Sequence, residues 1–282
     1  AMEIWRAQIE IGLSLFVFLS IYAFINWNNE KNERTNWLVI SAIFAGLAMA
    51  TKYIGFVALA SILILLTLHI KNSKEIGKNS KTRKLFIPIY FILISFIIES
   101  PWLIKNYIIK SNPVYPYFTN IFTATKFEGD KADILRGDIA HSQTSSIKDW
   151  LLLPWNMTMK SRTENPLNGP IFLFFFPLIG LFLFLKDSNG IFKNLLLFFI
   201  IYYLLWSFFS NLARFLMPAL AVMSIVIAYV FTRSPINIRK FLPLFFILIT
   251  LLNVSNTLVR LITLNGWRVV FGLISREDYL SS

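Results

Sequence analysis

Four ionisable residues lie in or beside otherwise apolar stretches of this 282-residue chain: Glu10, Lys52, Glu99 and Arg214. A charge at membrane depth is energetically costly, so such residues indicate a functional site by default. A carboxylate can orient or deprotonate a hydroxyl group. An ammonium group or a guanidinium group can hold a phosphate. These residue types therefore suit a reaction in which a phosphate is bound and a hydroxyl is activated.

Each of these charges also has an ordinary explanation, and both explanations stay open here. Glu10 can mark the start of a helix at the membrane interface. Lys52 can be a turn lysine whose ammonium group extends to water along its apolar stem. Arg214 follows a very short break between two apolar runs and can contact lipid headgroups.

The passage from Glu99 to Tyr107 contains further candidates. Glu99 or Lys105 could face a cavity. An aromatic belt with neutralising charges would explain Trp102 and Tyr107, because these residue types gather at membrane interfaces. That explanation accounts less easily for Glu99.

The composition is that of an integral membrane protein. The residues are 56% hydrophobic and only 15% charged, which is far from an ordinary soluble domain. The formal charge of +12 invites a nucleic-acid reading, but Lys and Arg gather in short loops between apolar runs, without a recognition module. We therefore expect no nucleic-acid partner. The chain has no cysteine and only two histidines, so we expect no metal and no other cofactor.

We predict an all-α fold, a polytopic bundle of about eight transmembrane helices in a single domain over residues 1–282. A bilayer core of about 30 Å needs roughly 20 apolar residues per helix, and several runs approach that length. The predicted spans are Ile9–Trp27, Trp37–Ala50, Tyr53–Ile70, Leu85–Ile98, Ile171–Leu185, Leu195–Phe209, Phe215–Phe231 and Phe241–Val259.

The distribution of Lys and Arg predicts the orientation of these spans. Short loops rich in these residues lie on the cytoplasmic side. The basic loops are 28–36, 71–84, 186–194 and 232–240. The four charges described first, and a long segment from about residue 100 to 169, are then expected on the opposite face. We expect this non-cytoplasmic segment to cap a cavity.

The site hypothesis depends on a hairpin at Lys52. A single helix from Trp37 to Ile70 would be about 51 Å long at 1.5 Å per residue, which is too long for one untilted crossing. Two crossings that turn at Lys52 fit better. A single crossing would leave Lys52 near the bilayer centre and move Glu10 to the cytoplasmic side.

Four passages together resemble the polytopic glycosyltransferases of the GT-C class. The resemblance is greatest to the bacterial membrane mannosyltransferase-like and aminoarabinose-transferase-like proteins. The passages are Gly46–Tyr53, Pro101–Tyr107, Asn112–Pro116 and Arg214–Leu220. Their order and spacing match an internal stretch of a longer family member, so we expect the chain to be incomplete at both ends. The acidic catalytic residue of the family's first outer loop would then precede Ala1.

The resemblance implies the transfer of a sugar from a polyprenyl-phosphate donor lipid to a glycan, lipid or protein acceptor. It places the reaction on the non-cytoplasmic face, toward the periplasm or exterior of a bacterial inner membrane. By position, Glu10 resembles an accessory acid, while Lys52 and Arg214 resemble cations that bind the lipid phosphate. Tyr53, Glu99, Lys105 and Asn106 are the remaining substrate-binding candidates.

Two other functions remain open. In a transporter or flippase, the same charges would line a permeation path, and an internal repeat with interrupted helices would be expected. We find no convincing repeat between the two halves of the chain. A noncatalytic membrane assembly subunit is the third possibility, which the missing upstream acid favours.

The predicted hairpin is directly testable, because the chain has no cysteine to interfere with labelling. Single-cysteine variants Lys52→Cys and Lys78→Cys should react with a membrane-impermeant thiol reagent from opposite faces of the membrane. Labelling of both variants from the same side would contradict the hairpin and, with it, the proposed site.

Overall fold

The computed structural model describes residues 9–29, 35–72, 81–118, 121–122, 190–209 and 212–233, with short stretches between 146 and 155 and between 240 and 277. Regular secondary structure within these residues is helical, which confirms the predicted all-α class. The predicted span Ile171–Leu185 and most of Phe241–Val259 lie outside the described residues. The predicted number of eight spans therefore stays a prediction.

Six of the predicted spans correspond to helices of the structure. They are α2 (Glu10–Asn29), α3 (Asn36–Thr51), α4 (Gly55–Asn72), α6 (Lys81–Lys110), α11 (Gly190–Phe209) and α12 (Met217–Arg233). The short helix α14 (Gly266–Val270) corresponds to none of the predicted spans. Among the described residues, α2, α4, α6, α11 and the stretch Arg214–Arg233 are long and apolar enough to cross a membrane, and α3 is somewhat shorter.

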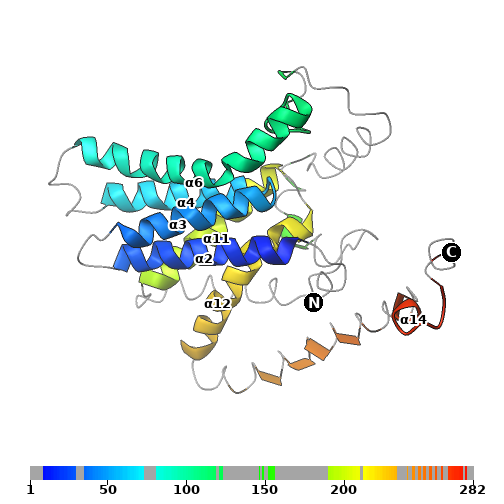
Figure 1. Cartoon of the computed structure of the whole chain (residues 1–282). Helices are drawn as coiled ribbons and strands as arrows, with labels where there is room; N and C mark the ends of the chain where they lie inside the picture. The colour runs from blue at the N-terminus through cyan, green and yellow to red at the C-terminus, as the bar shows by residue number, and fades with distance from the viewer. Residues whose placement is uncertain are drawn as a thin grey trace. The chain divides into compact units, whose positions relative to one another are not determined.

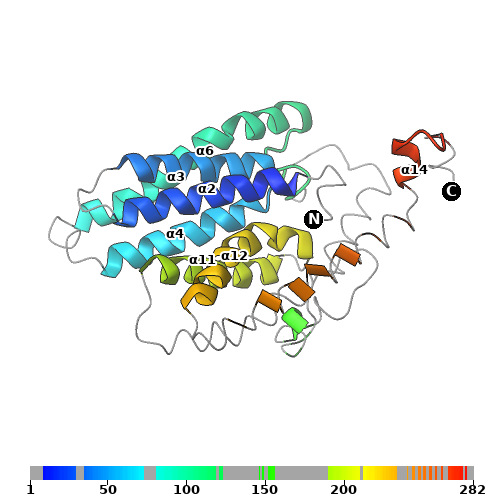
Figure 2. The same cartoon turned by 90° about the horizontal axis from the view of Figure 1, so that it is seen from below.

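The chain divides into two compact units. The larger unit, residues 8–153 and 185–226, contains every candidate site residue. Within it, α3 packs against α2, α4 and α6, and α4 packs against α11. These helices lie side by side in both views (Figures 1 and 2). The described part of the other unit comprises the end of α12, α14 and short stretches around them.

The core of the larger unit consists of apolar side chains joined by a few buried hydroxyl groups. Leu13, Val17 and Ile21 lie one helical turn apart on α2 and have no exposed surface. Ser20 on α2 and Ser41 on α3 each donate a hydrogen bond to the other's carbonyl oxygen, at 2.7 and 2.8 Å. Small hydroxyl residues of this kind allow close helix contact in a membrane.

The chain turns sharply between α3 and α4, so two separate helices are present and not one long helix. The turn consists of residues 52–54, and the Gly55 amide donates to the Lys52 carbonyl at 2.8 Å. A Cβ atom at Gly55 would collide with the Ala48 carbonyl oxygen. Glycine therefore permits the close approach of the two helices, and the hairpin predicted at Lys52 is present.

Helix α6 is longer than predicted. The sequence predicted that its apolar run ends at Ile98, but the helix continues through Pro101 to Lys110. Proline lacks the amide that would bond to the Ile97 carbonyl. The Ser100 hydroxyl donates to that carbonyl at 2.7 Å and compensates for the missing bond. The chain therefore leaves the helix at Ser111, where φ is 53°, and the bounds of the outer segment stay a prediction.

The contact between α3 and α6 yields a stability prediction. A Cβ atom at Gly46 would lie 2.5 Å from the Ser95 carbonyl oxygen and 2.7 Å from Ile98 Cβ. Gly46→Ala should therefore destabilise the protein by about 1–3 kcal/mol, because backbone must move. Gly12→Ala is the matched control: nothing lies within 4 Å of its added Cβ. Thermal unfolding should show a lower midpoint only for Gly46→Ala; equal midpoints would contradict the packing.

Candidate functional site

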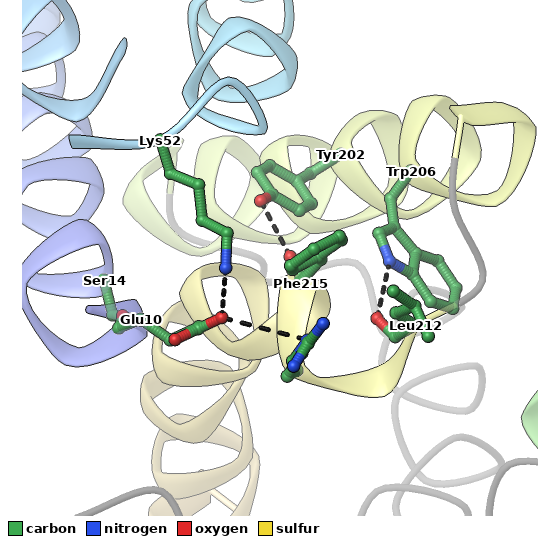
Figure 3. Close-up of polar contacts among 8 residues, drawn as sticks. Glu10, Ser14, Lys52, Tyr202, Trp206, Leu212 and Phe215 are labelled. Atoms are coloured by element: carbon green, nitrogen blue, oxygen red, sulfur yellow. Dashed lines mark hydrogen bonds and ion pairs between the residues drawn. The ribbon is translucent and has the colours of Figure 1, made fainter. Parts of the chain in front are cut away.

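Three of the four charges that the sequence singled out meet at one end of the bundle. Glu10 lies in the first turn of α2, Lys52 is the residue after α3, and Arg214 lies in the 3-10 turn Ala213–Leu216, η1. The Lys52 ammonium group donates to Glu10 Oε1 (Figure 3). Arg214 Nε lies 4.0 Å from the same oxygen. One carboxylate oxygen thus joins two cations from separate parts of the chain.

The position of each charge suits the helix on which it lies. A negative charge is favourable at a helix N-terminus and a positive charge at a C-terminus. Glu10 occupies the N-terminal turn of α2 and Lys52 the C-terminal end of α3. Glu10 is only 2% exposed, whereas the side chains of Lys52 and Arg214 are 28% and 39% exposed. Two cations against one carboxylate leave an excess positive charge on the accessible side, which suits an anion.

An aromatic ring lies beneath both cations. The Lys52 Nζ atom is 4.4 Å from the centroid of the Phe215 ring, and the Arg214 guanidinium carbon is 5.2 Å from it. A cation over a ring face gains about 0.5–1 kcal/mol at exposed sites and more when desolvated. The Phe215 ring therefore helps to hold both charged groups. We name Glu10, Lys52, Arg214 and Phe215 the charge cluster.

Helix α11 fixes the turn that carries Arg214. The Tyr202 hydroxyl donates to the Phe215 carbonyl at 3.0 Å, and Trp206 Nε1 donates to the Leu212 carbonyl at 3.1 Å (Figure 3). Tyr202 and Trp206 are four residues apart, so they lie on one face of the helix, and neither has exposed surface. Neither residue was among the candidates predicted from the sequence, although two aromatic side chains with polar atoms at this spacing were a signal.

Tyr53 and Asn106 belong to a second group of contacts. The Tyr53 hydroxyl donates to the Tyr115 carbonyl at 2.7 Å and accepts a bond from Asn106 Nδ2 at 3.0 Å. Asn106 Nδ2 also lies 3.4 Å from the Pro113 carbonyl oxygen. Both side chains thus bind the segment that follows α6.

Glu99 and Lys105, the other two candidates on α6, lie outside the charge cluster. Glu99 is fully buried, and neither carboxyl oxygen has a hydrogen-bond partner among the described residues. Lys105 Nζ lies 4.8 Å from the centroid of the Trp102 ring, on the same helix. The structure therefore brings together Glu10, Lys52 and Arg214, and places Tyr53 and Asn106 in a separate hydrogen-bond network.

The described residues offer no group of three or more His, Cys, Asp or Glu side chains suited to a metal ion. The arrangement can bind an anion at the exposed side of Lys52 and Arg214, because the ammonium and guanidinium groups are cationic hydrogen-bond donors that match phosphate oxygens.

One family model matches the N-terminal part of the chain. Residues 7–112 match the family model of dolichyl-phosphate-mannose-protein mannosyltransferases. This family belongs to the GT-C class, which confirms the resemblance to GT-C glycosyltransferases over the matched residues. The match supports, as a general class, a membrane glycosyltransferase that depends on a polyprenyl-phosphate sugar. No curated protein and no solved structure matches the chain.

The buried carboxyl group of Glu99 leads to a prediction on stability. A buried polar group without a partner costs about 1–3 kcal/mol, and a charged group more. Glu99→Gln replaces the buried ionisable carboxyl group by a neutral amide at nearly constant volume, so the unfolding midpoint should rise. Glu277→Gln is the matched control because Glu277 is exposed; its midpoint should not change. A lower midpoint for Glu99→Gln would show that Glu99 has a stabilising partner.

Proposed function

We propose that the chain carries the lipid-phosphate site of a GT-C glycosyltransferase, which transfers a sugar from a polyprenyl-phosphate donor. The observation that supports this most directly is the pair of partly exposed cations that share one oxygen of Glu10. Their excess positive charge suits a phosphate, and the family match overlaps Glu10 and Lys52. Arg214 lies outside the matched residues but reaches the same carboxylate.

The charge cluster suits the departing group of such a reaction. The bond between the sugar's anomeric carbon and the phosphate oxygen breaks, while a bond forms to the acceptor hydroxyl oxygen. The acceptor proton passes to a base, and the released polyprenyl phosphate gains one negative charge. Lys52 and Arg214 would meet this developing charge, and donors already fixed in position are the ones that stabilise a transition state most effectively.

In this proposal, Glu10 is an accessory acid that positions the cations. A general base must reach the proton that it removes. Glu10 is 2% exposed and already bound to Lys52, so its geometry suits the holding of Lys52 and Arg214. The base that deprotonates the acceptor would then be a different group.

The location of the site belongs to the same proposal. We place the charge cluster at the non-cytoplasmic face of a bacterial inner membrane, because the basic loops of the sequence lie at the other ends of the helices. The acceptor would approach from the periplasm or exterior as a glycan, a lipid or a protein. The donor would enter from the bilayer.

Arg214→Ala tests the proposed function. Transfer of radiolabelled mannose from polyprenyl-phosphate mannose should fall by about a hundredfold or more in membranes that contain the variant protein. This is the scale of losing one donor to a developing anion. Arg233→Ala is the matched control, since it removes an exposed arginine from the C-terminal end of α12, the helix that follows η1.

The control variant should retain transfer, and both variants should be present at equal amounts in the membrane. Unchanged transfer by Arg214→Ala would contradict the role of Arg214. If the wild-type protein transfers no sugar from polyprenyl-phosphate mannose, glucose or aminoarabinose, the phosphate site is tested by binding alone. The binding of polyprenyl phosphate, the reaction product, to the purified protein is then measured. Equal binding by the wild type and Arg214→Ala would overturn the phosphate site.

A further inference from the structure

Two consecutive residues of the hairpin between α3 and α4, Lys52 and Tyr53, contact different parts of the protein. Lys52 binds Glu10 and covers the Phe215 ring. Tyr53, the next residue, binds Asn106 and the segment after α6. The backbone of Lys52 is extended, with φ −163° and ψ 143°. Consecutive side chains of extended backbone point in opposite directions. The hairpin is therefore held on both sides.

The segment after α6 is a turn that Asn112 closes. Asn112 is fully buried; its Oδ1 accepts from the Val114 amide at 3.0 Å, and its Nδ2 donates to the Tyr117 carbonyl at 2.8 Å. An asparagine that bonds its own backbone two residues on is a common way to stabilise a turn. The turn 112–117 thus has a defined shape of its own.

Tyr53 connects this turn to the hairpin. Its hydroxyl donates to the Tyr115 carbonyl and accepts from Asn106. Its ring meets the Tyr117 ring edge to face, with the centroids 5.2 Å apart. Such an aromatic pair stabilises the contact beyond the area that it buries. Movement of the turn would therefore move Tyr53 and the residue before it.

We propose that Tyr53 and Asn106 are positioning residues, which hold the Lys52 ammonium group at Glu10 and Phe215 by fixing the hairpin to the turn 112–117. This inference rests on the proposed phosphate site, and it adds a structural connection from the turn 112–117 through Tyr53 to Lys52. The turn begins the outer segment, so a substrate or loop that shifts the turn would change the affinity of the phosphate site. The link gives a role to two residues that the sequence predicted to bind substrate directly.

The test uses Tyr53→Phe, which removes the hydroxyl and keeps the ring. The probe is a polyprenyl monophosphate, whose affinity for the purified full chain in nanodiscs is measured directly. Two hydrogen bonds are lost, so binding should weaken by about three- to tenfold. Tyr107→Phe is the matched control, because the Tyr107 ring lies on the same helix as Asn106 and is 61% exposed. Its affinity should equal that of the wild type.

A double-mutant cycle distinguishes positioning from a general loss of structure. Because Tyr53 is proposed to act through Lys52, Tyr53→Phe should have no further effect on affinity in a Lys52→Ala protein. An equal loss in both backgrounds would overturn the inference, as would equal affinities of Tyr53→Phe and Tyr107→Phe. If Tyr53→Phe fails to fold, Asn106→Leu removes the other half of the link and is tested in the same cycle.

The cycle also separates this inference from the proposed function. If Lys52→Ala binds the polyprenyl monophosphate as tightly as the wild type, the phosphate site itself is wrong. If Lys52→Ala loses affinity while Tyr53→Phe retains it, the phosphate site stands and the positioning role is overturned. A loss in Tyr53→Phe that disappears without Lys52 supports both.

Discussion

The ion pair between Glu10 and Lys52 is the interaction on which the site depends. Glu10 is nearly inaccessible to solvent, and a buried carboxylate that loses its cation is strongly destabilising. The pair joins the start of α2 to the end of α3, two points far apart in sequence. It also fixes where the Lys52 side chain lies, and therefore where the excess positive charge is presented. Arg214 then completes a cluster whose centre is already defined.

A short connection makes this arrangement possible. Only residues 52–54 separate α3 from α4, and Gly55 allows the two helices to approach closely. A longer loop would have to order Lys52 at an additional cost in conformational entropy. The turn that carries Arg214 is also held in place, because Tyr202 and Trp206 of α11 donate hydrogen bonds to its carbonyl groups. Lys52 and Arg214 thus both lie on backbone whose conformation is already fixed.

The sequence predicted the apolar helices well, because a run of Phe, Leu and Ile has few alternatives in a membrane. It did not predict that α6 continues past Pro101. The Ser100 hydroxyl replaces the hydrogen bond to the Ile97 carbonyl that proline cannot make, and this depends on a side-chain rotamer that the sequence does not specify. It selected Glu10, Lys52 and Arg214 because charges are rare in apolar runs. The sequence did not single out Tyr202 and Trp206, because aromatic residues in apolar runs are usually core residues. Their role depends on which face of α11 meets the turn.

Glu10 has two opposing effects on an anion that binds beside it. It repels a phosphate, yet without it Lys52 and Arg214 would repel each other and would have no fixed geometry. The Phe215 ring reduces the conflict, because a cation over a ring face keeps a favourable contact when it shifts away from the carboxylate. The Lys52 ammonium group can then donate a hydrogen bond to a phosphate without leaving Glu10 unpaired, since Arg214 Nε lies 4.0 Å from the same Glu10 oxygen. Two cations around one carboxylate thus keep Glu10 paired when the cluster is empty and leave an excess positive charge that attracts an anion.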